Sequence, residues 1–198
     1  LPREISTRSL ATLRSSIADT AARILPDDGL DVVCFACTSG TVAVGEDASL
    51  AELRRGAPGA KATTLAGGVR KALSALGARR IVIATPYVDG LTADVARFFE
   101  AAGFEVLDAQ GLGLDYDAEM IRVAPSFLEE FAAGIDRPDA DAVLISCGAL
   151  RTSGMVERTE RRLGKPLVTS NQAMLWDCLR LAGIEDRLEG LGRLLREH

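Results

Sequence analysis

The sequence contains a single histidine, and that histidine is the last of its 198 residues, His198. A Ser-His-Asp triad, a Cys-His dyad and a histidine-ligated metal site each require a histidine inside the fold, so the sequence excludes all three. The proton transfers of an enzyme with this sequence must therefore come from Cys, Asp, Glu, Lys or Tyr side chains. We expect no metal site.

Long apolar runs, basic runs and cysteines are also scarce. No apolar stretch approaches the ~20 residues that span a bilayer, and the opening Leu-Pro-Arg-Glu-Ile-Ser lacks the charged-then-apolar pattern of a secretion signal. Basic residues are scattered through a chain of net charge −5, which argues against nucleic acid and membranes as partners. Four cysteines are too few for a disulfide scaffold. We predict a cytoplasmic protein.

The apolar content comes mainly from alanine, leucine, valine and glycine, which is typical of helices packed on a sheet. Short apolar runs alternate with helical periods, and this pattern indicates βαβ units with parallel strands, an α/β fold. Strands are predicted over 31–37, 61–64, 80–85, 104–108, 141–147 and 166–169, and the main helices over 9–25, 65–76, 89–102, 153–163 and 172–181. A glycine-rich loop is expected at 111–116.

The two halves of the chain resemble each other. Residues 31–37 align with 141–147, and residues 63–77 align with 169–183. Each half then contains a strand that ends in Cys, a linking helix, a strand that ends in two hydroxyl residues, and a helix that ends in Gly. Two matches in the same order indicate a duplication. We predict a first lobe made of residues 1–77 and 169–198, and a second lobe made of residues 78–168.

Cys37 and Cys147 occupy equivalent ends of two predicted strands, and ligands of parallel sheets bind outside such ends. Small residues follow both cysteines, including Thr38, Ser39 and Gly148, so backbone N–H groups can bind an anion there. The same groups would stabilise a thiolate and lower the thiol pKa from about 8.5. Two facing thiols suit removal of a proton from one face of a carbon and its return on the other, or attack by one thiol while the other handles the proton.

The remaining cysteines have simpler explanations. A free cysteine is ordinarily a small core hydrophobe, and we assign Cys34 and Cys178 to packing. Cys34 and Cys37 form a C-x-x-C, but both lie in one predicted strand and face opposite sides, whereas a thioredoxin-type pair opens a helix. A redox role is the weakest alternative, and zinc lacks a second ligand pair.

Three other segments carry polar groups at strand ends. The Tyr87 hydroxyl can bind a carboxylate or donate a proton, and the alternative is a half-buried tyrosine under a loop. Residues 169–172 form a helix N-cap that either binds an anion or only caps the helix. Asp115, Asp117 and Glu119 are expected to be a solvated acidic helix start. The pair Gly111 and Gly113 lacks the rest of a dinucleotide fingerprint, so no NAD site is predicted.

These motifs together resemble the aspartate/glutamate racemase superfamily, in the branch of maleate cis-trans isomerase and arylmalonate decarboxylase. The motifs are Val33-Cys-Phe-Ala-Cys37-Thr-Ser-Gly40, Thr85-Pro-Tyr87, Ile145-Ser-Cys147-Gly-Ala149 and Val168-Thr-Ser-Asn171-Gln-Ala-Met-Leu-Trp176. The resemblance implies two Rossmann-like lobes related by a pseudo-twofold axis, with cofactor-independent chemistry in the cleft between them.

The resemblance also implies unequal roles for the two thiols. Cys37 would add to a substrate double bond and Cys147 would handle the proton, an isomerase or racemase chemistry that needs both cysteines. The decarboxylase branch keeps only the second cysteine. Substrate carboxylates would be held by Tyr87 and by the segments Thr38-Ser39 and Ser170-Asn171.

Two departures from the family leave the substrate open. The family opens with a strand and an asparagine-bearing loop, whereas this chain begins at the following segment, so we expect that strand to be absent or the first lobe to be shortened. An asparagine of the family is replaced in this region by Asp115 or Asp117, and an aspartate would repel a dicarboxylate such as maleate. An Asp/Glu-type racemase, an ectoine-utilisation enzyme with a zwitterionic substrate, and a non-catalytic carboxylate-binding protein stay as alternatives, and so does a homodimer.

Overall fold

The structure is a computed structural model that describes residues 5–25 and 29–198. All strand pairs within it are parallel, and helices separate the strands along the chain. The predicted α/β class with parallel sheets is therefore confirmed. The strands are β1 (Val32–Phe35), β2 (Lys61–Thr64), β3 (Arg80–Tyr87), β4 (Glu105–Leu114), β5 (Ala142–Ile145) and β6 (Leu167–Thr169). The helices are α1 (Thr7–Ala11), α2 (Arg14–Ala21), α3 (Thr38–Val44), α4 (Glu46–Gly56), α5 (Leu65–Ala75), α6 (Asp89–Ala101), α7 (Asp117–Met120), α8 (Pro125–Ile135), α9 (Val156–Leu163), α10 (Ser170–Leu181) and α11 (Arg193–Glu197).

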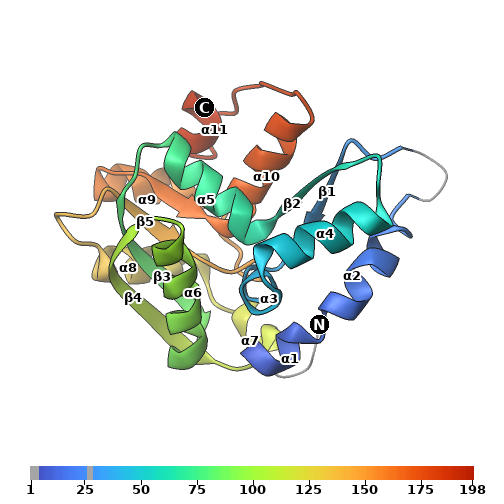
Figure 1. Ribbon diagram of the computed structural model, residues 1–198. Helices are drawn as coiled ribbons and strands as arrows, with labels where there is room; N and C mark the ends of the chain where they lie inside the picture. The colour runs from blue at the N-terminus through green and yellow to red at the C-terminus, as the bar shows by residue number, and fades with distance from the viewer. Residues whose placement is uncertain (1–4, 26–28) are drawn as a thin grey trace.

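The strands form two separate sheets. One sheet has four strands in the order β4-β3-β5-β6, and the other has the two strands β1-β2. Figure 1 shows the larger sheet on the left and the smaller one on the right, with α5 and α10 between them. These two helices pack against each other, so they join the two sheets into one body.

Burial explains why the central strands form. Every residue of β5 is buried, and so is every residue of β3 after Arg80. Such continuous apolar runs are typical of parallel strands that are covered on both faces. Helix α6 covers β3 and β4, α8 packs on β3 and β5, and α9 packs on β6. The main hydrophobic core lies around this sheet.

The smaller sheet has a much smaller core of its own. Helices α2 and α4 pack together beside it, and the buried apolar residues there are Ile17, Ala21, Val33 and Leu53. Within the described ranges, β1 pairs with β2 on one side only, whereas β5 lies between β3 and β6. The sheet of the first half therefore lacks, among these residues, a counterpart of β3.

The strand registers repeat between the halves. Phe35 of β1 pairs with Thr64 of β2, and Ile145 of β5 pairs with Thr169 of β6. Thr64 and Thr169 then cap α5 and α10 through their side chains. The predicted alignment of 63 with 169 is therefore wrong by one residue at this point, because the two capping threonines are equivalent. The predicted alignment is correct at the ends of these two helices, because α10 has 12 residues and α5 has 11, and the extra residue of α10 compensates for the shift.

Two predicted elements near the N-terminus end earlier than expected. The helix predicted over 9–25 is divided into α1 and α2, because the Thr12 hydroxyl and backbone N–H both turn back onto the Ser9 carbonyl and end α1. The strand predicted over 31–37 stops at Phe35. Cys37 is therefore not a strand residue but the N-cap of α3. Elsewhere in the chain, the helix predicted over 153–163 begins later than expected, at Val156.

The glycine-rich loop predicted at 111–116 is instead mostly strand. Strand β4 continues to Leu114 because β3 also runs further than predicted, and Leu114 pairs with Tyr87. A Cβ atom at Gly111 would lie 2.1 Å from the Tyr87 carbonyl oxygen, so only glycine allows this close approach. The register shifts between Thr85 and Tyr87, and this irregularity accommodates the approach.

No helix in the described part of the chain is both long and apolar enough to cross a membrane. The predicted lobes, 1–77 with 169–198 and 78–168, stay a proposal. The proposal is supported by the position of β1 and β2 in one sheet and of β3, β4 and β5 in the other.

Candidate active site

A cavity of about 190 Å³ opens at the carboxyl ends of β1, β3 and β5. It brings together both candidate thiols and four of the six residues predicted to bind substrate. Its lining consists of Ile5, Ala36, Cys37, Thr38, Ser39, Tyr87, Asp117, Cys147, Gly148 and Ala149.

Cys37 enters the cavity from the start of α3. Its sulfur accepts a hydrogen bond from the Gly40 N–H at 3.2 Å and lies 3.8 Å from the Ser39 hydroxyl oxygen. A Cβ atom at position 40 would lie 2.9 Å from this sulfur, so glycine is needed there. Burial raises the pKa of the Cys37 thiol, while the Gly40 and Ser39 hydrogen bonds act in the opposite direction.

Cys147 enters the cavity from the other half, two residues after β5, just as Cys37 follows β1 by two residues. Its side chain is buried, and its sulfur accepts a hydrogen bond from the Ala149 N–H at 3.3 Å. Burial raises the pKa of this thiol to about 11, against the lowering effect of Tyr87 and of the Ala149 N–H. The N–H groups of Gly40 and Ala149 thus lower the two thiol pKa values, as expected, but burial outweighs them and both values lie above the ordinary one.

Tyr87 connects the two thiols. It is 2% exposed, and its hydroxyl is hydrogen bonded to Cys147 and to Ser39. Burial is the main reason why the pKa of Tyr87 lies well above its usual value, so the phenol stays neutral. Together with the contact between Ser39 and Cys37, these bonds form a continuous path from one sulfur to the other.

Ser170 and Asn171 are not among the residues that line the cavity. The Ser170 hydroxyl is buried and lies 3.1 Å from the Thr38 hydroxyl, which ties α10 to α3. The Asn171 amide donates to the carbonyls of Gly148 and Leu150, at 3.1 and 3.0 Å. Both side chains thus hold the segments that carry lining residues.

Asp117 is placed differently from the solvated side chain that the sequence predicts. It is half-buried and lines the cavity, whereas Asp115 and Glu119 are exposed. Burial raises the pKa of Asp117, and its charge in turn raises the pKa of Cys37 and Cys147. Among the described residues, no lysine, arginine or histidine lines the cavity.

Ile5, Ala36 and Ala149 complete the lining, and the sequence analysis did not select Ile5 or Ala36. The Ile5 N–H donates to the Asp115 carbonyl at 2.9 Å, which holds this apolar side chain beside the start of α7. An isolated isoleucine near the N-terminus carries no pattern that predicts such a contact.

Cys34 and Cys178 lie against each other in a separate place, hydrogen bonded between β1 and α10. An ion pair between Lys71 and the buried Asp177, 2.8 Å long, stands beside them. All four cysteines are free. The assignment of Cys34 and Cys178 to packing stays a prediction. The argument against a redox-active C-x-x-C pair is now different, because Cys37 is the N-cap of a helix but Cys34 is hydrogen bonded to Cys178.

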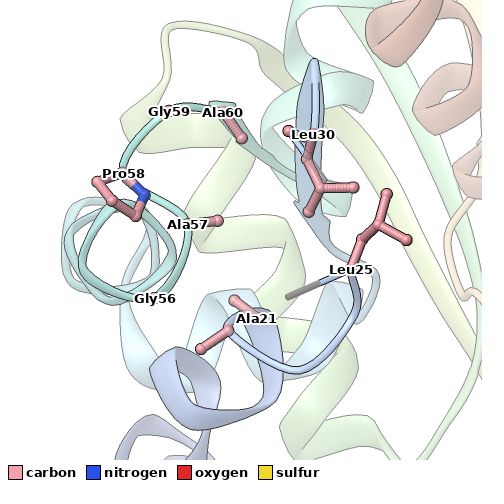
Figure 2. A pocket seen from close by; sticks show the side chains of 10 residues that line it. Ala21, Leu25, Leu30, Gly56, Ala57, Pro58, Gly59 and Ala60 are labelled. Carbon is pink, nitrogen blue, oxygen red and sulfur yellow. The ribbon is translucent and has the colours of Figure 1, made fainter. Parts of the chain in front are cut away.

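A second hollow, of about 170 Å³, lies between the end of α2 and the turn after α4 (Figure 2). Its lining consists of Ala21, Ala22, Leu25, Gly29, Leu30, Gly56, Ala57, Pro58, Gly59 and Ala60. Among the described residues, none of the side chains that line this hollow can ionise, attack or coordinate.

The chain matches the family model described as arylmalonate decarboxylase over residues 3–195. The chain belongs to the arylmalonate decarboxylase family. An arylmalonate decarboxylase of Bordetella bronchiseptica is 36% identical, over 92% of this chain and 78% of the relative. A maleate isomerase of Pseudomonas putida is 29% identical, over 98% of this chain and 80% of the relative.

Solved structures of this family share the fold. A maleate cis-trans isomerase of Nocardia farcinica, a cysteine-to-serine variant with a covalently bound succinylcysteine intermediate, superposes with a TM-score of 0.90. It is 25% identical, and the match covers 99% of this chain and 83% of the isomerase. These relatives confirm the predicted resemblance and the predicted class of enzyme, an isomerase related to a decarboxylase.

Proposed function

We propose that this protein is a cofactor-independent isomerase or racemase of a small carboxylate, and that Cys37 and Cys147 are its catalytic residues. One observation carries the proposal: two free thiols from equivalent positions in the two halves line a single cavity. In the arylmalonate decarboxylase family, two such thiols favour proton exchange or the formation of a thiol adduct rather than decarboxylation.

The donors beside the thiols suit a substrate carboxylate. Thr38 and Ser39 present hydroxyl groups at the start of α3, and Tyr87 presents a neutral phenol. The backbone after Cys147, at Gly148 and Ala149, lines the same cavity. Ser170 and Asn171 act as positioning residues through Thr38 and Gly148.

For cis-trans isomerisation the pair must hold one proton, with Cys37 as thiolate and Cys147 as thiol. The Cys37 sulfur forms a bond to one alkene carbon, the double-bond electrons move to the neighbouring carbon, and Cys147 gives that carbon its proton. After rotation about the single bond, Cys147 takes the proton back and the carbon–sulfur bond breaks. The succinylcysteine in the Nocardia isomerase is what such addition produces from maleate in that enzyme.

For racemisation the same pair would act without a covalent bond. One thiolate removes the α-proton from one face, and the opposite thiol returns a proton on the other face, so the two cysteines exchange roles after each turnover. The presence of Asp117 in the cavity favours this second reaction, because its charge disfavours a dicarboxylate.

The test is the replacement of each thiol in turn. Cys37→Ser and Cys147→Ser should each lower turnover by at least a thousandfold while the melting temperature changes little. Cys178→Ser, which alters a thiol outside the cavity, should keep full turnover. If either active-site variant retained wild-type activity, the paired mechanism would be wrong. If neither the wild type nor any variant showed turnover, the protein would be a non-catalytic carboxylate-binding protein.

A further inference from the structure

A second pair of thiols lies outside the candidate active site. Cys34 belongs to β1 and Cys178 belongs to α10, and their side chains are hydrogen bonded to each other although they are far apart in the sequence. Strand β1 packs on α10, so this is a contact between the smaller sheet and a helix that also packs on β6 of the larger sheet. Both cysteines are free and only partly buried, so a small solute can reach the pair.

The surroundings make the two thiols unequal. The hydrogen bond from Cys34 lowers the pKa of Cys178, and the same bond raises the pKa of Cys34, so Cys178 ionises first. The Asp177 carboxylate beside the pair opposes ionisation, but the Lys71 ammonium lies 2.8 Å from that carboxylate and favours it. A thiolate in contact with a second, protonated thiol is the arrangement that mild oxidation converts into a disulfide.

We propose that Cys34 and Cys178 are an oxidation site, which forms a reversible disulfide between β1 and α10 when the protein meets a peroxide. The Cys178 thiolate attacks one oxygen of hydrogen peroxide, the O–O bond breaks, and hydroxide leaves and takes up a proton to give water. Cys178 is then a sulfenic acid. The Cys34 sulfur attacks the Cys178 sulfur, the S–O bond breaks, and the Cys34 proton leaves with the oxygen as a second water. Two thiols are oxidised and one peroxide is reduced, and a dithiol reductant reverses the bond.

The disulfide would restrain the first half of the molecule. It joins β1, whose unit has only a small core of its own, to a helix that packs on the larger sheet. A cross-link between segments so distant in the sequence stabilises the folded state mainly by restricting the unfolded chain. Because Cys34 and Cys178 do not line the cavity, this inference is independent of the proposed function.

The test begins with reduced wild-type protein at neutral pH, treated briefly with a stoichiometric amount of hydrogen peroxide. Remaining thiols are alkylated, and peptides are mapped by mass spectrometry without reduction. We expect one cross-linked species, between the peptides of Cys34 and Cys178. Cys37 and Cys147 should stay free, because burial raises their pKa and leaves little thiolate. Oxidation should raise the melting temperature by about 5 °C or more, and dithiothreitol should reverse the rise.

Three variants separate the steps. Cys34→Ala should stop at the sulfenic acid of Cys178, which dimedone traps, whereas Cys178→Ala should give neither the adduct nor the cross-link. Cys147→Ala, at a cysteine outside the pair, should keep the cross-link. A wild-type protein in which Cys178 stays reduced, or in which Cys34 is cross-linked to Cys37 instead, would overturn the inference without any variant. A cross-link that leaves the melting temperature unchanged would overturn the restraint of β1.

Discussion

The hydroxyl oxygen of Thr38 lies 3.1 Å from the hydroxyl oxygen of Ser170, and both side chains are buried. This contact joins the helix that begins at the first thiol to the helix that follows the last strand. Ser170, which does not line the cavity, thus holds the lining residue Thr38 in place.

We expect Ser170→Ala to lower the free energy of unfolding by about 1–2 kcal/mol, because it leaves the Thr38 hydroxyl buried without this partner. KM should rise more than kcat falls, since Thr38 would lose its orientation toward a substrate carboxylate. Urea denaturation and steady-state kinetics measure the two effects. Ser15→Ala, at an exposed hydroxyl on α2, is the matched control; equal effects of the two changes would contradict the role of the buried pair.

The thiols of the substrate-free protein should react slowly with iodoacetamide at pH 8. With a pKa of about 11, only about one Cys147 side chain in a thousand is a thiolate at that pH, roughly a hundredfold less than for the usual value of 9.0. The labelling rate, followed by mass spectrometry of the Cys147 peptide, should rise up to about pH 11. A plateau below pH 9 would show that the hydrogen bonds outweigh burial after all.

The same shift predicts a loss of stability in alkaline solution. Because the pKa of Cys147 is higher in the folded protein than in the unfolded chain, the folded state binds the extra proton. This stabilisation is fully present below about pH 9 and is lost as the pH rises toward 11, and it amounts to at most about 3 kcal/mol. Urea denaturation at pH 8 and 10.5 should therefore give a smaller alkaline loss for Cys147→Ala than for the wild type, and an equal loss would refute the assignment.

Tyr87→Phe should lower kcat by tenfold or more, because it removes the hydroxyl that stabilises the Cys147 thiolate and links it to Ser39. The pKa of Cys147 should also rise further, which the labelling profile would detect. Tyr116 is exposed and is the second of two tyrosines in the sequence, so Tyr116→Phe is a matched control. A Tyr87→Phe enzyme with an unaltered labelling profile would exclude the hydrogen-bonded path.

Gly111→Ala should destabilise the protein by several kcal/mol or prevent folding, because its Cβ atom would lie 2.1 Å from the backbone oxygen of Tyr87, which cannot rotate away. Gly134→Ala makes the same substitution within α8, where nothing lies within 4 Å, and should stabilise the protein by up to about 1 kcal/mol. Thermal melts of both variants test the comparison. A tolerated Gly111→Ala would mean that β3 and β4 can separate at this point.

The residues at strand ends could be predicted from the sequence because topology places them. Parallel strands bring their carboxyl ends to one edge of a sheet, so Tyr87 and Cys147 lie together at the ends of β3 and β5. Cys37 follows β1 of the smaller sheet, and the packing of the two sheets brings it into the same cavity. The small residues after each cysteine could be found for the same reason. The cavity therefore follows largely from the order of strands.

The rest of the cavity depends on paths that local patterns do not encode. Asp117 lines the cavity because β4 continues past its predicted end and delivers α7 to that edge, and Ile5 arrives through a backbone hydrogen bond to Asp115. The thiol pKa values also depend on how deeply the side chains are buried, which only the packed structure determines. Tertiary packing decided each of these points.

Among the described residues β1 pairs only with β2, and this pairing and the small core beside it have a consequence for dynamics. Opening the β1-β2 unit with α2 and α4 exposes only a few buried apolar side chains, whereas opening the larger sheet disrupts the main core. Such a unit reaches its open state at a lower free energy than the whole molecule, so its amides should exchange with solvent first. Cys37 follows β1 of this unit, and Cys147 follows β5 of the larger sheet. The proposed nucleophile would therefore lie on the unit that opens at the lower free energy, and the proposed proton-handling thiol on the unit that contains the main core.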